Sequence, residues 1–200
     1  MATEAGETPE LAVPAIHSER LALESMSVPF MRALLARDLV AAEREVGAHV
    51  PAWLPDQLDH FLQYRLAQLA VDPSILEWLG RSMVMTDDAG RRRIVGTIGF
   101  HGPPDPQRRV EIGYSVDPVY RRRGLAREAV RAMLDWAVAT HGVRRFVASI
   151  SPANEASLGL VAGFGFVQTG SQMDDIDGLE LVFETDWPPA MATSVAGGDP

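Results

Sequence analysis

The sequence contains neither cysteine nor lysine, so all 18 of its basic residues are arginine. Without cysteine the chain cannot form disulfides, use a thiolate nucleophile or hold a metal through sulfur. No apolar run approaches the ~20 residues that a membrane span needs. The acidic, polar stretch from Met1 to Glu10 also lacks the basic start and apolar centre of a secretory signal. We therefore expect a cytoplasmic protein without a membrane segment.

Several patterns typical of catalytic or binding sites are absent too. None of the five histidines forms an i, i+4 pair around a glutamate, so we expect no metal site. There is no Gly-x-Ser-x-Gly elbow, which argues against a serine hydrolase. A net charge of -9 and an isoelectric point near 5.0 argue against nucleic-acid binding, because phosphate backbones attract positive surfaces.

The length and composition are those of one globular domain. Two hundred residues, 46% of them hydrophobic, can bury a substantial core. Residues 1–15 hold Thr, Gly, Pro and Glu with little periodicity, and Pro, Ala, Gly and Ser dominate residues 188–200, so we expect a flexible N-terminal tail and a disordered C-terminal tail. Residues 16–187 are then a single domain.

The remaining sequence alternates strand and helix patterns. Period-two stretches predict strands, and apolar residues at helical spacing predict helices over 30–46, 56–71 and from Gly124 to Gly142, with a short helix ending at Ala162. The strands lie at 20–25, 83–85, 94–100, 109–116, 145–150, 166–170 and 179–185. Because the strands at 109–116 and 145–150 flank one helix, they should pair in parallel. We expect an α/β fold of the α+β type.

The stretch from Tyr114 to Ala129 carries the clearest functional signal. A strand runs through a proline turn into an arginine-rich loop that opens a helix near Gly124. The first N–H groups of a helix lack partners, and Gly124 and Ala126 have almost no side chain to keep a ligand away. Arg121, Arg122, Arg123 and Arg127 add positive charge. This combination predicts a phosphate or pyrophosphate site, although a solvated basic loop before an ordinary helix has the same sequence.

The loop resembles the acetyl-CoA pyrophosphate loop, Arg-x-x-Gly-x-Ala, of the GNAT superfamily of N-acyltransferases. Here the motif is Arg121-x-x-Gly124-x-Ala126. A second segment, Asn154-Glu-Ala-Ser157 followed by Gly165-Phe166, is similar to the branch that contains the RimJ and RimL acetyltransferases. Together with Glu111-Ile-Gly-Tyr and Arg127-Glu-Ala, these matches cover about residues 109–170.

The resemblance implies a mixed central sheet of about six to seven strands flanked by about four helices, with a parallel strand pair splayed around acyl-CoA. It also implies acetyl-CoA as co-substrate. The residues that would contact it are Tyr114, Ser115, Val116, Arg121, Arg122, Arg123, Gly124, Leu125, Ala126, Asn154 and Ser157. Asn154 would contact the pantetheine arm, or cap a helix, or do both.

The resemblance also suggests catalytic residues. Glu111 occupies a position similar to that of a carboxylate base in some relatives, although it would equally suit a polar strand face. Many members of the family have a tyrosine acid seven residues after the asparagine, but this chain has Val161 there. In the RimJ and RimL branch, Ser157 would instead hydrogen-bond the CoA sulfur, and helix capping is the alternative role.

The acceptor would be a primary amine, either a protein N-terminus or a small molecule. In the family the early helices wall the acceptor pocket, which makes Trp53 and Tyr64 candidates for substrate contact, unless they are core aromatics. His101, after a strand, is a further candidate and an alternative base. A homodimer is one open oligomeric state. The competing function is a non-catalytic sensor or assembly module that binds CoA or acyl-CoA.

Overall fold

The structure is a computed structural model that describes residues 13–174 and 178–188. Its eight strands form one mixed sheet in the order β1-β2-β3-β4-β5-β6-β8-β7. Among the described strands, only β5 and β6 pair in parallel. The expected fold is confirmed, with eight strands rather than six or seven. One of the additional strands is β1, a two-residue segment paired with β2.

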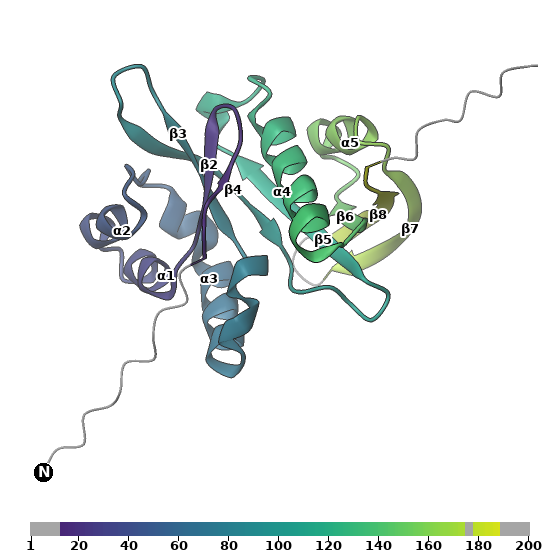
Figure 1. Cartoon of the computed structure of the whole chain (residues 1–200), viewed down its shortest axis with the longest axis horizontal. Helices are drawn as coiled ribbons and strands as arrows, with labels where there is room; N and C mark the ends of the chain where they lie inside the picture. Colours follow the sequence, from purple (N-terminus) through teal and green to yellow (C-terminus); the bar gives the residue numbers. More distant parts are fainter. Residues whose placement is uncertain (1–12, 175–177, 189–200) are drawn as a thin grey trace, which may run out of the picture. The chain divides into compact units, whose positions relative to one another are not determined.

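The elements follow one another as Figure 1 shows. The strands are β1 Ile16–His17, β2 Leu21–Ser25, β3 Arg81–Thr86, β4 Arg92–Phe100, β5 Arg109–Val116, β6 Arg145–Ile150, β7 Val167–Asp174 and β8 Gly178–Asp186. The α-helices are α1 Val28–Leu35, α2 Leu39–Val46, α3 Leu54–Val71, α4 Leu125–His141 and α5 Glu155–Ala162. Two 3₁₀ helices are η1 Pro73–Trp78 and η2 Pro118–Tyr120.

The chain divides into two compact units. The first holds the described residues up to Pro103 together with Ile112–Met133, and the second holds Pro104–Glu111 and the described residues from Leu134 onward. Strand β5 contributes to both units. Its residues 112–116 pair with β4, and its residues 109–111 pair with β6.

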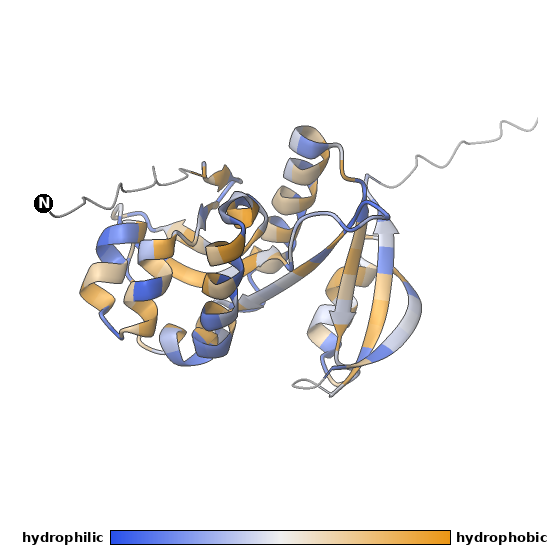
Figure 2. Ribbon diagram, turned by 90° about the horizontal axis from the view of Figure 1, so that it is seen from below, coloured by the Kyte–Doolittle hydropathy of each residue, from blue (hydrophilic) through white to orange (hydrophobic). Residues whose placement is uncertain are grey.

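The core of the first unit lies between helices α1–α3 and strands β3 and β4. Phe30, Leu34, Leu54 and Leu62 are at most 1% exposed and belong to one hydrophobic cluster with Val84 and Ile94. Figure 2 shows hydrophobic and hydrophilic segments alternating along these helices. Such amphipathic helices bury one face against a sheet and leave the other to water.

The prediction of a single helix over residues 30–46 is wrong. The structure breaks it into α1 and α2, and Arg37 between them has a positive φ of 59°. Asp38 begins α2, since its side chain accepts a hydrogen bond from the N–H of Ala41 at 3.0 Å. Asp is a common N-cap, so this residue carried a local signal for the break that the apolar periodicity obscured.

The core of the second unit forms around β6. Phe146, Ala148 and Ile150 point to one buried face of this strand. The Trp187 ring packs edge-on against Phe164, with 5.5 Å between ring centroids. Strand β7 pairs only with β8 among the described strands and exposes most of its residues. It is therefore the edge of the sheet in this unit.

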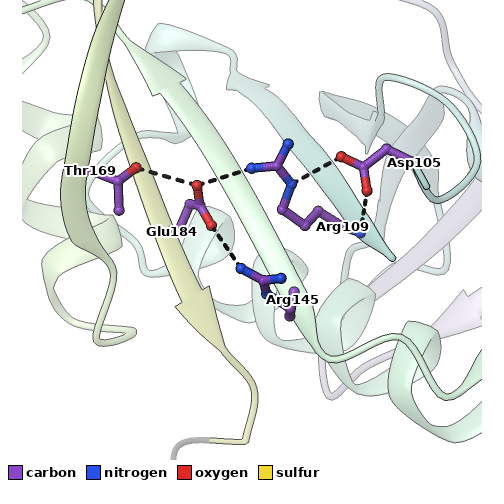
Figure 3. Close-up of polar contacts among 5 residues, drawn as sticks. All are labelled: Asp105, Arg109, Arg145, Thr169 and Glu184. Carbon is purple, nitrogen blue, oxygen red and sulfur yellow. Dashed lines mark hydrogen bonds and ion pairs between the residues drawn. The ribbon is translucent and has the colours of Figure 1, made fainter. Parts of the chain in front are cut away.

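An ion-pair network joins three strands of the second unit (Figure 3). Arg109 of β5 stands opposite Arg145 of β6 in the parallel register, which brings two positive charges together. Glu184 of β8 forms ion pairs with both arginines, at 3.1 Å from Arg109 Nη1 and 3.5 Å from Arg145 Nη2. Asp105 binds Arg109 Nε at 2.9 Å. The hydrogen bond that Arg109 donates to Asp105, together with the nearby carboxylate charges, raises the pKa of Arg109, despite some desolvation. Two carboxylates thus compensate the two like charges.

The first turn of α4 is tied to the turn between β1 and β2. Glu128 accepts hydrogen bonds from Ser18 Oγ at 2.7 Å and from Arg20 N at 2.6 Å, and forms an ion pair with the Arg20 guanidinium at 2.7 Å. Arg20 Nη1 also donates to the carbonyl of Arg123 at 3.0 Å. The pair Arg20 and Glu128 thus fixes both the start of α4 and the loop before it.

Two sequence predictions concern the termini and the membrane. The expected tails at 1–15 and 188–200 fall almost entirely outside the described residues. Within the described part of the chain, no helix has the length and apolar character that crossing a bilayer demands.

The Glu128 tether predicts a pH-dependent contribution to stability. Burial alone would raise the pKa of the Glu128 carboxyl, but the hydrogen bonds from Ser18 and Arg20 and the charge of Arg20 outweigh it and hold that pKa below its usual value. A carboxyl with a depressed pKa stabilises the fold above its unfolded value of ~4.3 and loses this contribution as pH falls through the folded value. Glu128→Gln should therefore lower the free energy of unfolding by about 1–2 kcal/mol near neutral pH.

Urea denaturation of both proteins at about pH 7 and about pH 3.5 measures the effect, and the difference should shrink at the lower value. Glu45→Gln is the matched control, because Glu45 is exposed on α2 and has no hydrogen bond or ion pair to the described residues. A difference that is unchanged at low pH would contradict the ionic tether.

Candidate functional site

The loop between β5 and α4 is shaped by its own hydrogen bonds. Asp117, 9% exposed, accepts from the N–H of Val119 at 2.9 Å and from the indole Nε1 of Trp53 at 2.9 Å. The first bond starts the η2 turn, and the second ties the loop to the start of α3. Trp53 is half-buried and its indole donor is used here.

Three consecutive arginines in this loop have different surroundings. Arg121 Nε donates to the carbonyl of Val116 at 3.0 Å, and the Arg123 guanidinium lies 5.3 Å from the centre of the Tyr120 ring. Arg122 is exposed, has a φ of 59°, and makes no hydrogen bond or ion pair with the described residues. Arg122 is thus the arginine of the three that remains available to an anion.

Gly124 is the point at which the loop becomes a helix. Its φ of 78° is one that L side chains rarely adopt. A Cβ built here would meet no atom nearer than Arg20 Nη2 at 3.5 Å, so the space beside this backbone is open. The first intrahelical bond runs from Glu128 N to the Gly124 carbonyl, at 3.0 Å. The preceding N–H groups of Leu125 to Arg127 therefore lack intrahelical acceptors, as at any helix start.

A cavity of about 210 Å³ lies in the same unit, lined from α3, β4 and β5. Its lining residues are Met26, Gln57, Leu58, Phe61, Arg65, Gly80, Thr97, Ile98, Gly99, Phe100, His101, Gly113, Tyr114 and Ser115. Three residues singled out in the sequence are therefore at the cavity, namely His101, Tyr114 and Ser115. Trp53 and Tyr64 are not among its lining residues.

The wall of this cavity along β5 is closely packed. A Cβ on Gly113 would lie 2.9 Å from Nε2 of His101, so the absence of a side chain at 113 lets the imidazole lie against the strand. Gln57 of α3 donates from Nε2 to Ser115 Oγ at 3.0 Å. These contacts hold the end of β4 and the start of α3 against residues 113–115 of β5.

Arg65 is a buried cation in the wall of the cavity. It is 5% exposed, and its Nη1 donates to the His101 carbonyl at 2.7 Å and to Gln68 Oε1 at 2.8 Å. Its guanidinium carbon lies 4.9 Å from the centre of the Phe61 ring and 5.3 Å from that of Tyr64. Burial lowers the pKa of Arg65, although an arginine in a protein stays protonated. Tyr64 itself is 57% exposed.

The remaining candidates belong to the second compact unit. Asn154 is the N-cap of α5, and its Oδ1 accepts from the N–H of Ser157 at 3.1 Å. Asn154 is exposed and Ser157 half-buried. Val161, at the position of the family's tyrosine, is 1% exposed and serves the core. Glu111 is half-buried in β5, opposite Val147 of β6.

Part of the cavity lining carried no functional prediction from the sequence. Arg65, Phe61 and Gln57 of α3 were not singled out, and neither was Arg20. The sequence did contain a signal that Arg65 is buried. Arg65 follows Leu58 by seven residues and Leu62 by three, and this spacing places it on the apolar face of α3. An arginine at such a position is either paired in the core or available for a ligand.

Comparisons of the sequence and the fold with known proteins indicate the family of the chain. A sequence model described as acetyltransferase (GNAT) domain matches residues 28–167. YoaA of Bacillus subtilis, itself an uncharacterised N-acetyltransferase, is 35% identical over 79 residues, which are 40% of this chain and 45% of YoaA. YjdG of the same bacterium, also an uncharacterised N-acetyltransferase, is 26% identical over 154 residues, or 76% of this chain and 89% of YjdG.

A solved structure has the same fold. The ribosomal α-N-protein acetyltransferase RimL, determined in complex with coenzyme A, aligns with a TM-score of 0.57 at 15% identity, over 86% of this chain and 97% of RimL. At that identity the likeness concerns the fold alone. The family match, in contrast, runs through both compact units and spans well over half of the sequence. The chain therefore belongs to the GNAT family of acetyltransferases.

Proposed function

We propose that this protein moves an acetyl group from acetyl-CoA to a primary amine by direct attack in a ternary complex. The observation that carries the proposal is the loop before α4. It combines an open approach to the Gly124 backbone, the N–H groups of Leu125 and Ala126, which have no intrahelical acceptor, and the exposed cation of Arg122. Such a loop fits the pyrophosphate of a CoA thioester, which supplies an activated acetyl group.

Strand β5 offers a place for the pantetheine arm. Residues 112–116 pair with β4 along one edge, and the register of β5 with β6 ends at Glu111 in the described residues. A strand edge without a partner can bind an extended ligand through main-chain hydrogen bonds, as in strand addition. The amide groups of pantetheine would then pair with the backbone near Tyr114 to Val116.

Asn154 can serve both as a helix cap and as a contact to the pantetheine arm. Its Oδ1 caps α5, so its amide NH₂ group is the part that points away from the helix N–H. That NH₂ makes no hydrogen bond to the described residues. It is therefore available to donate to a carbonyl of the arm. The Asn154 and Ser157 pair also supports placing the chain in the RimJ and RimL-like branch.

The chemistry needs a neutral amine, whose nitrogen forms a bond to the thioester carbonyl carbon as the carbon–sulfur bond breaks. Deprotonating the amine near pH 7 costs roughly 1 kcal/mol for an α-amine and about 4.6 for a lysine. Glu111 would accept the amine proton, directly or through water, and Ser157 would donate a hydrogen bond to the leaving sulfur. Because a thiol has a pKa near 8.5, the thiolate leaves without strong help, which makes the absence of a tyrosine at Val161 tolerable.

A non-catalytic CoA sensor is the second candidate function, and the buried Val161 is the observation that favours it. Incubation with acetyl-CoA and a panel of amines separates the two. We expect thiol release above the background of acetyl-CoA hydrolysis, with the acetylated product identified by mass spectrometry. Tight binding of CoA with no thiol release on a broad panel would instead support the sensor.

Arg122 provides a test of the CoA loop that spares the fold. Asn tolerates a positive φ better than Arg, so Arg122→Asn removes the charge without straining the backbone. By contrast, any side chain at Gly124 would meet the strain of its φ of 78°, and a substitution there would also affect folding. Calorimetry should show the dissociation constant of CoA rising about two- to fivefold at low salt, and less at high salt.

The matched control for this experiment is Arg108→Asn. Arg108 also has a φ of 59° and lies before β5, outside the CoA loop, so the change in charge and backbone preference is the same. An equal loss of affinity in both variants would mean that net charge, and not the loop, governs CoA binding.

Glu111→Gln tests the proposed base. If Glu111 takes the amine proton, kcat near pH 7 should fall by about 10² or more while CoA affinity stays the same. The loss should shrink at about pH 9.5, where an α-amine acceptor is already neutral. Ser157→Ala should lower kcat by a smaller factor that does not change with pH. An equal effect of Glu111→Gln at both pH values would assign Glu111 to positioning rather than to proton transfer.

A further inference from the structure

The cavity in the first unit has an unusual distribution of charge. Met26, Leu58, Phe61, Ile98 and Phe100 give it a largely apolar wall. Among its described lining residues there is no carboxylate, and the one permanently charged side chain is Arg65. A pocket built for a polycationic amine would need acidic groups. This one instead offers a cation within an apolar surface.

Arg65 has unused hydrogen-bonding capacity. The two hydrogen bonds that its side chain donates, to Gln68 Oε1 and to the His101 carbonyl, both come from Nη1. Nε is buried and has no hydrogen-bond partner, and Nη2 likewise makes no hydrogen bond to the described residues but keeps accessible surface. Three of the five guanidinium N–H groups therefore lack an acceptor. No carboxylate of the described residues forms an ion pair with this side chain, which is 5% exposed.

The two unused nitrogens share one edge of the guanidinium. Nε–H and one N–H of Nη2 point in parallel, and of these two nitrogens only Nη2 keeps accessible surface, so a carboxylate would contact Nη2 first. The Nη1 bonds to Gln68 and to the His101 carbonyl fix the plane of the group from the other side. The rings of Phe61 and Tyr64 near its faces offset part of the unfavourable burial but supply no acceptor. A buried charge of this kind is usually paired, and the described residues supply no anion for it, so the site suits an anionic ligand.

Arg65 also lies close to the strand that the proposed reaction uses. Its Nη1 binds the carbonyl of His101, and the His101 imidazole lies against Gly113 of β5. Residues 113–115 line the cavity, and 114–116 are the proposed contacts of the pantetheine arm. An acceptor that fills the cavity would thus place one end at Arg65 and the other along β5. The volume of about 210 Å³ lies below the roughly 300–1,000 Å³ of sites for drug-sized ligands.

We propose that the acceptor is a small amine that carries a carboxylate and an apolar group, as an apolar amino acid does, and that its carboxylate binds Arg65. This inference rests on the proposed function, because it treats the cavity as the acceptor site. The apolar group would contact Phe61, Phe100 and Met26. A protein N-terminus lacks a free carboxylate next to its amine, so it would leave the guanidinium without an anion.

Binding of reaction products tests this without any turnover. The probes are the N-acetyl forms of leucine, methionine and phenylalanine, each compared with its N-acetyl amide, in which a neutral carboxamide of nearly the same size replaces the carboxylate. We expect the wild-type protein to bind at least one of the acids more tightly than its amide by about tenfold or more, as measured by calorimetry or ligand-observed NMR. Equal affinity within every pair, or no binding of any acid at about 10 mM, would overturn the proposal.

Variants then assign the preference to Arg65. Arg65→Gln should reduce the acid-over-amide ratio to about one, and Arg65→Lys should retain part of it, because lysine keeps the charge but loses the two-pronged geometry. Arg32→Gln, which removes one exposed arginine of α1 outside the cavity, is the control with the same change in net charge. Circular dichroism and CoA affinity report on folding. A preference that survives in folded Arg65→Gln would also overturn the proposal, and the wild-type comparison stands even if that variant does not fold.

The two proposals fail in different ways. If the acids bind through Arg65 but no amine releases thiol from acetyl-CoA, the proposed activity is wrong and the anion site stands. If amines are acetylated while acids and amides bind alike, the activity stands and the assignment of the acceptor is wrong.

Discussion

The pairing of β5 is the constraint on which the site depends. This strand is held by β4 over residues 112–116 and by β6 over residues 109–111. At the β6 end, two arginines stand opposite each other and would repel without Glu184, which pairs with both. At its other end the strand leads into the loop that opens α4. Because β5 is fixed in this way, its backbone can present a regular edge and its loop can present a helix start.

The loop is held from outside by residues distant in the sequence. Glu128 binds Ser18 and Arg20, about 110 residues earlier in the chain, and Arg20 also reaches the Arg123 carbonyl. Trp53 anchors Asp117 at the start of the loop. These bonds leave the Gly124 backbone and the Arg122 side chain accessible, and ordered donors bind an anion at a lower entropic cost than mobile ones.

Charge is used differently in the cavity and in the loop. The loop carries exposed arginines, whose interactions with an anion are screened by salt, whereas Arg65 is buried among apolar side chains, where screening is weak. The exposed charges therefore suit attraction of a large phosphorylated partner. A buried cation with unused donors suits discrimination, because an acceptor without the matching anion leaves a charge unpaired.

The sequence by itself determined the features that depend on neighbouring residues. Alternation at 109–116, the glycine at 124 and the apolar spacing of α4 are local signals, and the structure places the strand, the turn and the helix where they indicate. Of the roles left open for Asn154, that of a helix cap is confirmed, and helix capping is also a local signal. The tertiary structure alone decided the pairing of Arg20 with Glu128, the fit of His101 over Gly113 and the burial of Arg65 away from every carboxylate of the described residues. Each of these depends on which distant segments pack together, and packing is set by the whole core rather than by any single stretch of the chain.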